Sequence, residues 1–152
     1  SYSLLDRAAE RDLLPFALRE GRTVIAYSPL AQGALTGRYD ASKHPGGVRR
    51  FNALFTPSNI AKAEPILGAL RRIGRAHAAT PAQIALAWCI RFPNVIAIPG
   101  AKSVEQIEEN AASADIELTG DDLSELDRLS QTFRVTGRWR DPQSVIRWLL
   151  TR

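Results

Sequence analysis

The sequence has one cysteine, no methionine and no long apolar run in its 152 residues. The single thiol, Cys89, excludes an internal disulfide framework, and within the apolar pattern IALAWCI it is interpreted as a small buried hydrophobe. No apolar run approaches the ~20 residues of a membrane-spanning helix, and no secretory signal pattern opens the sequence. These absences favour a cytoplasmic protein without a membrane segment.

Basic residues are scarce in one part of the chain only. Residues 93–130 contain nine acidic and two basic side chains, whereas residues 31–60, 61–92 and 131–152 carry net charges of +3, +4 and +4. Aromatic and basic residues do not alternate in the way that nucleic-acid-stacking surfaces require, so we expect no nucleic-acid partner. Two interpretations of the basic excess stay open, namely a solvated surface and a site for a small phosphorylated ligand.

Local patterns alternate between helices and short strands. Two short and nearly all-apolar runs, residues 22–27 and 95–98, are typical of strands that are buried on both faces. Pro15, Pro65 and Gly74 are irregular positions within predicted helices. The pattern predicts helices over residues 7–20, 58–79, 80–92, 120–130 and 142–150 and from residue 103 onward, with a long irregular loop over residues 30–57.

Alternating helices and short apolar strands predict a parallel α/β sheet. Only two or three strands are present, which is too few for a parallel sheet covered on both faces, and the outer edges of such a sheet would be open. By its own pattern, the chain is interpreted as part of a larger fold.

The stretch around residues 95–110 combines a strand, a glycine turn and a capped helix. Gly100 follows the strand, and Ser103 with Gln106 forms the S/T-x-x-E/Q pattern of a helix start. Free backbone N–H groups at the positive end of a helix bind anions, and Lys102 adds a cation beside them. We therefore predict a phosphate site here, with a solvated Lys102 as the alternative.

Two segments resemble the aldo-keto reductase family. Residues 24–37, VIAYSPLAQGALTG, are similar to the family's strand 7 signature, and residues 96–110, IAIPGAKSVEQIEEN, to its strand 8 and cofactor-helix signature. The opening YSLLDR and the segment TPAQIALAW also resemble family segments, in the family's order and spacing. The glycine-containing form IPGAKS looks closer to the bacterial general-stress-type and potassium-channel β-subunit branches.

The resemblance implies a (β/α)8 TIM barrel, of which the chain would supply the C-terminal portion, roughly strands 6–8 with their helices. Residues 1–152 would form a single partial domain, with residues 131–152 as its C-terminal tail. Family members bind NADPH across the carboxyl ends of the strands and reduce aldehydes and ketones by hydride transfer without a metal. The implied cofactor is NADP(H), and the implied substrate is a small carbonyl compound.

Carried over position by position, the resemblance assigns cofactor contacts to residues after each of the two strands. Tyr27 would stack against the nicotinamide ring, which agrees with an aromatic face at a strand end. Four residues would line the pyrophosphate: Ser28, Leu30, Gln32 and Gly33. Six would meet the 2′-phosphate and adenine end: Gly100, Lys102, Ser103, Gln106, Glu109 and Asn110.

The same comparison implies what this chain lacks. The family's catalytic Asp, Tyr, Lys and His lie on earlier strands, and no segment here resembles them. Without a proton donor for the developing alkoxide, we expect the chain alone to be inactive, with the missing N-terminal half of the barrel as its partner. The alternatives are a non-enzymatic nucleotide-binding or regulatory module of the same fold and an unrelated α/β interaction domain.

A few further side chains have two interpretations each. His44 and His77 have no matched partner and are interpreted as loop and surface residues. Several aromatic residues of the loop and the tail are candidates either for lining a substrate pocket or for packing: Phe51, Phe55, Phe133, Trp139 and Trp148.

Overall fold

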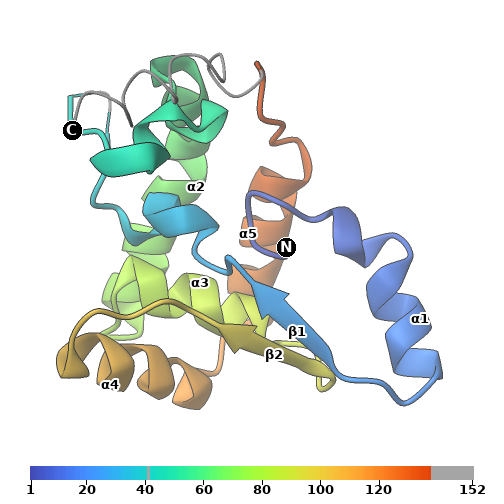
Figure 1. Cartoon of the computed structure of the whole chain (residues 1–152). Helices are drawn as coiled ribbons and strands as arrows, with labels where there is room; N and C mark the ends of the chain where they lie inside the picture. The colour runs from blue at the N-terminus through green and yellow to red at the C-terminus, as the bar shows by residue number, and fades with distance from the viewer. Residues whose placement is uncertain (41, 138–152) are drawn as a thin grey trace.

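The computed structural model describes residues 1–40 and 42–137, which form a small sheet with helices packed on one face (Figure 1). The chain alternates between short 3-10 helices (η), α-helices and strands. In order, the described elements are η1 Ala8–Glu10, α1 Leu13–Arg19, β1 Val24–Tyr27, η2 Ala31–Thr36, η3 Gly47–Phe51, η4 Ala53–Phe55, α2 Pro57–Ala76, α3 Pro81–Cys89, β2 Val95–Ile98, α4 Val104–Ala112, η5 Ser113–Asp115 and α5 Gly120–Gln131.

The two strands lie side by side and run parallel, as the alternating pattern predicts (Figure 1). Val24 is opposite Val95 at one end of the register, and Tyr27 is opposite Ile98 at the other. Beyond β1, the backbone N–H of Tyr2 donates to the carbonyl oxygen of Tyr27 at 3.3 Å, so the start of the chain lies beside the end of the strand. The carboxyl ends of both strands therefore lie at one edge of the sheet.

The prediction that these strands are buried on both faces is wrong. Side chains of a strand alternate between faces, and only one face of this sheet is covered by the described part of the chain. Ala26 and Val95 are buried in the core, whereas four apolar side chains of the other face are 53–63% exposed: Ile25, Tyr27, Ile96 and Ile98. An uncovered apolar face of this kind is typical of a surface that binds another protein segment.

The predicted helix over residues 7–20 is divided in two by the structure. A single 3-10 turn, η1, precedes α1, and Pro15 lies in the first turn of α1, where its missing N–H removes no helical hydrogen bond. Gly21 follows α1 with φ +60°, the left-handed conformation that ends many helices. The helix α1 therefore begins at Leu13, and Pro15 in its first turn does not break it.

The helices predicted over residues 80–92 and 120–130 begin at Pro81 and Gly120, and capping residues fix both starts. The Thr80 hydroxyl accepts from the N–H of Gln83 while the Gln83 side chain accepts from the N–H of Thr80, and Pro81 is the first residue of α3. Thr119 and Asp122 form the same reciprocal pair at the start of α5. Such pairs satisfy N–H groups that a helix start leaves without partners.

His77 is not a solitary surface residue, because it joins the end of α2 to the start of α5. Its Nε2 lies 2.9 Å from Oδ2 of Asp122, and both side chains are mostly buried. Burial raises the pKa of the Asp122 carboxyl, but hydrogen bonds from His77 and from the side chain and backbone of Thr119 more than offset this and lower it. The predicted absence of a partner for His77 was wrong because a partner 45 residues away leaves no local signal.

The helix α2 runs unbroken through both of its irregular positions. Pro65 lies inside it, and Gly74 lies in its last turn, where the chain folds back against the helix. A Cβ at Gly74 would lie 2.5 Å from the carbonyl oxygen of Ala79, whereas a Cβ at Gly68 in the same helix would meet nothing within 4 Å. Gly74 is thus required by a close backbone approach, and Gly68 is not.

We expect Gly74→Ala to lower the free energy of unfolding by ~1–3 kcal/mol, because the backbone at Ala79 must move to admit the methyl group. Gly68→Ala, the matched control, is expected to raise it by about 0.5–1 kcal/mol through helix propensity. Urea unfolding followed by circular dichroism measures both changes. Equal effects of the two substitutions would contradict the close approach at Gly74.

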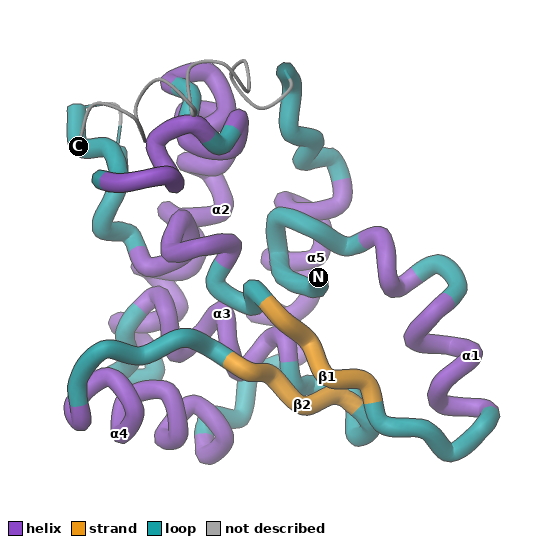
Figure 2. The backbone as a smooth tube through the Cα atoms, in the orientation of Figure 1, coloured by secondary structure: helices purple, strands orange, loops and turns teal. Residues whose placement is uncertain are grey.

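The predicted irregular loop over residues 30–57 contains three short helical segments, η2, η3 and η4 (Figure 2). Phe55 is 3% exposed and meets the ring of Tyr39 edge-on at 5.4 Å, and Phe51 is 8% exposed, so both pack rather than line an open pocket. Phe133 is buried as well, although its side chain borders a cavity. Trp139, Trp148 and the helix predicted over residues 142–150 lie outside the described residues.

Trp88 of α3 is at the centre of the packed helices and is fully buried. Its ring centroid lies 5.4 Å from that of Tyr2, and the guanidinium carbons of Arg91 and Arg7 lie 3.8 and 5.0 Å from it. Its Nε1 donates to Oδ1 of Asp127 at 3.1 Å. One indole therefore connects the start of the chain, α3 and α5.

Candidate functional site

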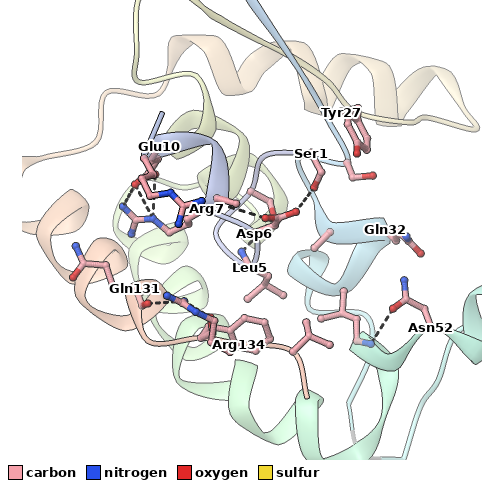
Figure 3. Close-up of a pocket in the computed structure, with 18 residues that line it drawn as sticks. Ser1, Leu5, Asp6, Arg7, Glu10, Tyr27, Gln32, Asn52, Gln131 and Arg134 are labelled. Atoms are coloured by element: carbon pink, nitrogen blue, oxygen red, sulfur yellow. Dashed lines mark hydrogen bonds and ion pairs between the residues drawn. The ribbon is translucent and has the colours of Figure 1, made fainter. Parts of the chain in front are cut away.

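A cavity of about 880 Å³ opens beside the carboxyl end of β1 (Figure 3). The loop after β1, the segment before α1, the turn at η4 and the chain after α5 all contribute to its wall. Three residues of the predicted site line it: Tyr27, Ser28 and Gln32. Tyr27 is 57% exposed, so a face of its ring is open to a ligand. Ligand sites in parallel α/β folds lie at this end of the strands.

The backbone of the loop after β1 adopts conformations that side chains normally avoid. Ser28, Ala31 and Gln32 have φ values of +52°, +48° and +57°, and Gly33 has +100°. Non-glycine residues in the left-handed region are strained, and such residues cluster at functional sites. Loops of mixed backbone handedness also aim N–H groups into a concave surface that suits anions. In this loop, the N–H groups of Ala31 and Gly33 donate to the carbonyl oxygens of Ser28 and Leu30, each at 2.9 Å.

Of the remaining residues in this set, Leu30 and Gly33 do not line the cavity. Leu30 packs against the hydrophobic core. A Cβ at Gly33 would lie 3.3 Å from Cε2 of Tyr39 and 3.7 Å from a guanidinium nitrogen of Arg49, so Gly33 allows the loop to pack closely against the segment that follows it. Both residues therefore pack the loop against the rest of the protein and do not border the cavity.

Arg49 contacts the loop after β1, which the sequence interpretation did not predict. Its Nη1 donates to the carbonyl oxygen of Gln32 at 3.1 Å, which brings a guanidinium onto the strained loop from 17 residues further along the chain. The basic excess of residues 31–60 is the signal that could have indicated it. A cation at this position adds positive potential to the same loop.

The second predicted set lies at the start of α4, which is the strand–turn–helix unit expected around residues 95–110. The Ser103 hydroxyl accepts from the N–H of Gln106 at 3.4 Å, and the Gln106 side chain accepts from the N–H of Lys102 at 2.9 Å. The predicted reciprocal capping is therefore shifted by one residue, to Lys102 in place of Ser103. The side chain of Lys102 stays exposed.

None of the α4 residues lines the cavity beside Tyr27. Gly100, Lys102, Ser103 and Glu109 are exposed, and Gln106 and Asn110 are partly buried on α4. Because β1 and β2 are adjacent and parallel, however, the loops after them leave the sheet from the same edge. The residues after β1 border the cavity, and the residues after β2 lie at the exposed start of α4. Both sets therefore lie beyond the same edge of the sheet.

Charged residues form a second part of the cavity wall. Arg7 and Glu10 line it and form an ion pair at 2.6 Å, and Arg91 pairs with Glu10 at 3.0 Å behind them. Burial raises the pKa of Glu10, but hydrogen bonds from Arg7, Tyr2 and Arg91 bring it below its usual value. Glu10 is therefore an ionised, fully engaged carboxylate that holds the wall in place.

In residues 1–40 and 42–137 no helix combines the length and the apolar character needed to cross a membrane. The same residues contain no group of three or more His, Cys, Asp or Glu side chains arranged to hold a metal ion.

Parallel strands, helices on one face and a cavity at the carboxyl ends define a partial α/β fold of the kind that barrel enzymes are built from. The sequence profile of the Aldo/keto reductase family matches residues 1–131. The chain belongs to the aldo/keto reductase family.

Relatives with named activities are oxidoreductases. An uncharacterized oxidoreductase of Mycobacterium tuberculosis is 48% identical over 151 residues, which are 99% of this chain and 47% of that protein. The NADH-specific methylglyoxal reductase of Escherichia coli is 37% identical over 124 residues, 81% of this chain and 38% of that protein. The chain thus spans less than half the length of these relatives.

Solved structures agree on the fold. An aldo-keto reductase from Klebsiella pneumoniae in complex with NADPH is 37% identical with a TM-score of 0.62, covering 89% of this chain and 39% of that one. The glycerol dehydrogenase from Gluconobacter oxydans has a TM-score of 0.79 over 93% of this chain and 43% of that one. At 22% identity the second likeness concerns the fold alone.

Proposed function

We propose that this chain is the NADP(H)-binding C-terminal portion of an aldo-keto reductase that reduces aldehydes or ketones by hydride transfer. The observation that carries the proposal is the open ring of Tyr27 at a strand end, beside a cavity and next to a strained loop. A relative of this family binds NADPH in its solved structure. Strands β1 and β2 would then be the seventh and eighth of the barrel.

The residues after β1 would hold the nicotinamide and pyrophosphate end of the cofactor. The exposed ring of Tyr27 offers a flat apolar face for stacking. Ser28 and Gln32 border the same cavity, and Arg49 adds a cation on the loop carbonyl of Gln32. A guanidinium beside this loop suits a diphosphate, whose negative charge it would partly balance.

The residues at the start of α4 would hold the adenosine end. The pKa of Glu105 is lowered by hydrogen bonds from its own backbone N–H and from Ser103, as expected for a negative group at a helix start. Lys102 is exposed there and forms no ion pair among the described residues, so its ammonium group is available to a 2′-phosphate. Glu109 and Asn110 lie further along α4, toward the adenine.

When bound, the cofactor supplies the hydride that reduces the carbonyl carbon. The residues of this chain would bind and orient the cofactor and border the carbonyl substrate. Among the described residues that line the cavity there is no histidine or lysine, and Tyr27 is the single tyrosine. The proton donor for the alkoxide is therefore proposed to come from the portion of the barrel that this chain does not match.

The uncovered face of the sheet is the argument for the proposed partner, which is the remaining portion of the same barrel. The exposed side chains of Ile25, Ile96 and Ile98 lie on the face opposite the core, and the chain covers 47% of its mycobacterial relative. Barrel strands normally bury both faces, since helices cover one and the other strands of the barrel cover the second. The remaining strands of the barrel would cover this face.

The proposal predicts that Lys102→Ala selectively weakens binding of NADPH. Loss of one charge-assisted contact to the 2′-phosphate is expected to raise the NADPH dissociation constant by roughly tenfold. NADH lacks that phosphate, so its affinity should stay the same. Titration followed by nicotinamide fluorescence measures both constants.

The matched control is Lys43→Ala, which removes an exposed lysine from the segment between η2 and η3 that does not line the cavity. It should leave both affinities unchanged. An equal loss of NADPH and NADH affinity in Lys102→Ala, or a chain that binds neither nucleotide, would overturn the proposed cofactor site.

A further inference from the structure

We propose that Asn59 is a positioning residue for the cavity beside Tyr27, because its buried amide fastens residues 133–136 to the turn at η4. This inference rests on the proposed function, in which that cavity receives the nicotinamide and the substrate. Asn59 itself does not line the cavity. It would act through the two wall segments that it joins.

The Asn59 side chain uses all of its hydrogen-bonding capacity in this connection. It is fully buried near the start of α2, and its Nδ2 donates to the carbonyl oxygens of Ala53 at 2.7 Å and Thr136 at 2.9 Å. Its Oδ1 accepts from the backbone N–H of Thr136 at 3.0 Å and from the Thr136 hydroxyl at 3.1 Å. A single amide thus pairs with the backbone of Thr136 on both sides and with η4.

Both ends of this connection continue into the cavity wall. Ala53 lies between Asn52 and Leu54, which line the cavity, and Thr136 directly follows a run of lining residues that ends at Val135. Figure 3 shows Asn52 and Arg134 on one side of the cavity and Tyr27 on another. The amide therefore sets the spacing between two walls that face the proposed nicotinamide position.

Burying an amide side chain lowers the stability of the fold unless each of its polar atoms has a hydrogen-bond partner. An apolar side chain of the same size would pack at this position but would leave the N–H and C=O of Thr136 without partners. The directed pairing, with four bonds from one side chain, fixes the chain direction of residues 133–136 as well as their distance. Apolar packing alone would not specify that direction.

The hydrogen bonds of Asn59 with Ala53 and Thr136 are called the clamp below. Its test compares the affinity of Asn59→Ala for NADPH with its affinity for a ligand that carries only the adenosine end. If the clamp shapes the nicotinamide end, the fluorescence emission of bound NADPH should shift toward that of free NADPH and its affinity should fall roughly tenfold. The affinity for 2′,5′-ADP, which carries only the adenosine end, should stay the same. Lys62→Ala is the control, because it removes an exposed bond to the same Thr136 hydroxyl and should change neither value.

A merely structural role of Asn59 would reduce the affinities for NADPH and 2′,5′-ADP together, and that result would overturn the proposal. Unchanged NADPH emission and affinity would overturn it too. Thr136→Pro is the second variant, because it deletes the N–H and hydroxyl from the segment side and leaves the helix α2 intact. It should lower the affinity for NADPH and leave the affinity for 2′,5′-ADP unchanged, as is expected of Asn59→Ala.

Hydrogen exchange separates this inference from the proposed function. In the ligand-free chain, the Thr136 amide should exchange roughly tenfold faster or more in Asn59→Ala, and at the original rate in Lys62→Ala. If the original chain binds no nucleotide, the proposed function fails, whereas the exchange result still tests the clamp. Unchanged exchange at Thr136 in Asn59→Ala would show that no clamp exists.

Discussion

Trp88→Ala is expected to lower the free energy of unfolding by ~3–5 kcal/mol, the range for removing a large buried aromatic side chain. The indole packs against Tyr2, lies under the guanidinium groups of Arg7 and Arg91 and donates to Asp127. Its removal would leave a cavity and deprive the Asp127 carboxylate of one donor. Since whole domains are stable by only about 5–15 kcal/mol, this loss is a large share of the total free energy of unfolding.

Urea unfolding followed by far-ultraviolet circular dichroism measures this change without relying on the fluorescence of the deleted indole. Trp88→Phe keeps a ring beneath the two guanidinium groups and should cost clearly less. Val104→Ala removes a side chain that is 65% exposed and should stay within about 0.5 kcal/mol of the original. A Trp88→Ala chain as stable as the Val104→Ala chain would show that α3 is not packed as described.

The second large effect concerns catalysis. The purified 152-residue chain should give no NADPH-dependent reduction of a small carbonyl such as methylglyoxal, because the proposed function places the proton donor for the alkoxide in the portion of the barrel that this chain does not match. A well-placed general acid contributes about 10²–10⁴-fold to such a reaction, and the loss of substrate positioning adds to that. The assay follows NADPH absorbance at saturating cofactor, with the methylglyoxal reductase of Escherichia coli and NADH as the positive control.

Turnover by the chain alone would mean that its own residues provide an acid. The described cavity wall offers Tyr27 and Asp6 as the groups to examine first, and Tyr27→Phe would then identify or exclude the phenol. A reduction that persists in Tyr27→Phe and disappears on removal of NADPH would contradict the proposal that this chain binds the cofactor while the proton donor lies elsewhere in the barrel.

Local sequence patterns predicted those parts of the fold that local forces determine. The helices predicted over residues 80–92 and 120–130 begin at Pro81 and Gly120 with reciprocal caps, and the apolar run at residues 95–98 is a strand. The glycine-rich segments after both strands form loops at one edge of the sheet. In these places neighbouring residues supply each other's hydrogen-bond partners, so a short window contains the information.

Features that depend on distant partners could not be predicted in this way. Burial of the strands was overestimated, because an apolar run does not show which other segments are present to cover it. The pairing of His77 with Asp122 and the contact of Arg49 with Gln32 join segments that are far apart in the sequence. Gly74 looked like a helix breaker, although the structure needs it because Ala79 folds back onto the helix.

The most direct test of the account combines this chain with the portion of the Mycobacterium tuberculosis oxidoreductase that it does not match. The two polypeptides are co-expressed, purified together and assayed for NADPH oxidation with methylglyoxal. We predict turnover that requires both parts and that falls at least roughly tenfold in Tyr27→Ala, since the nicotinamide would lose its stacking face. A co-purified pair that binds NADPH but never turns over would contradict the account and favour a non-enzymatic nucleotide-binding module.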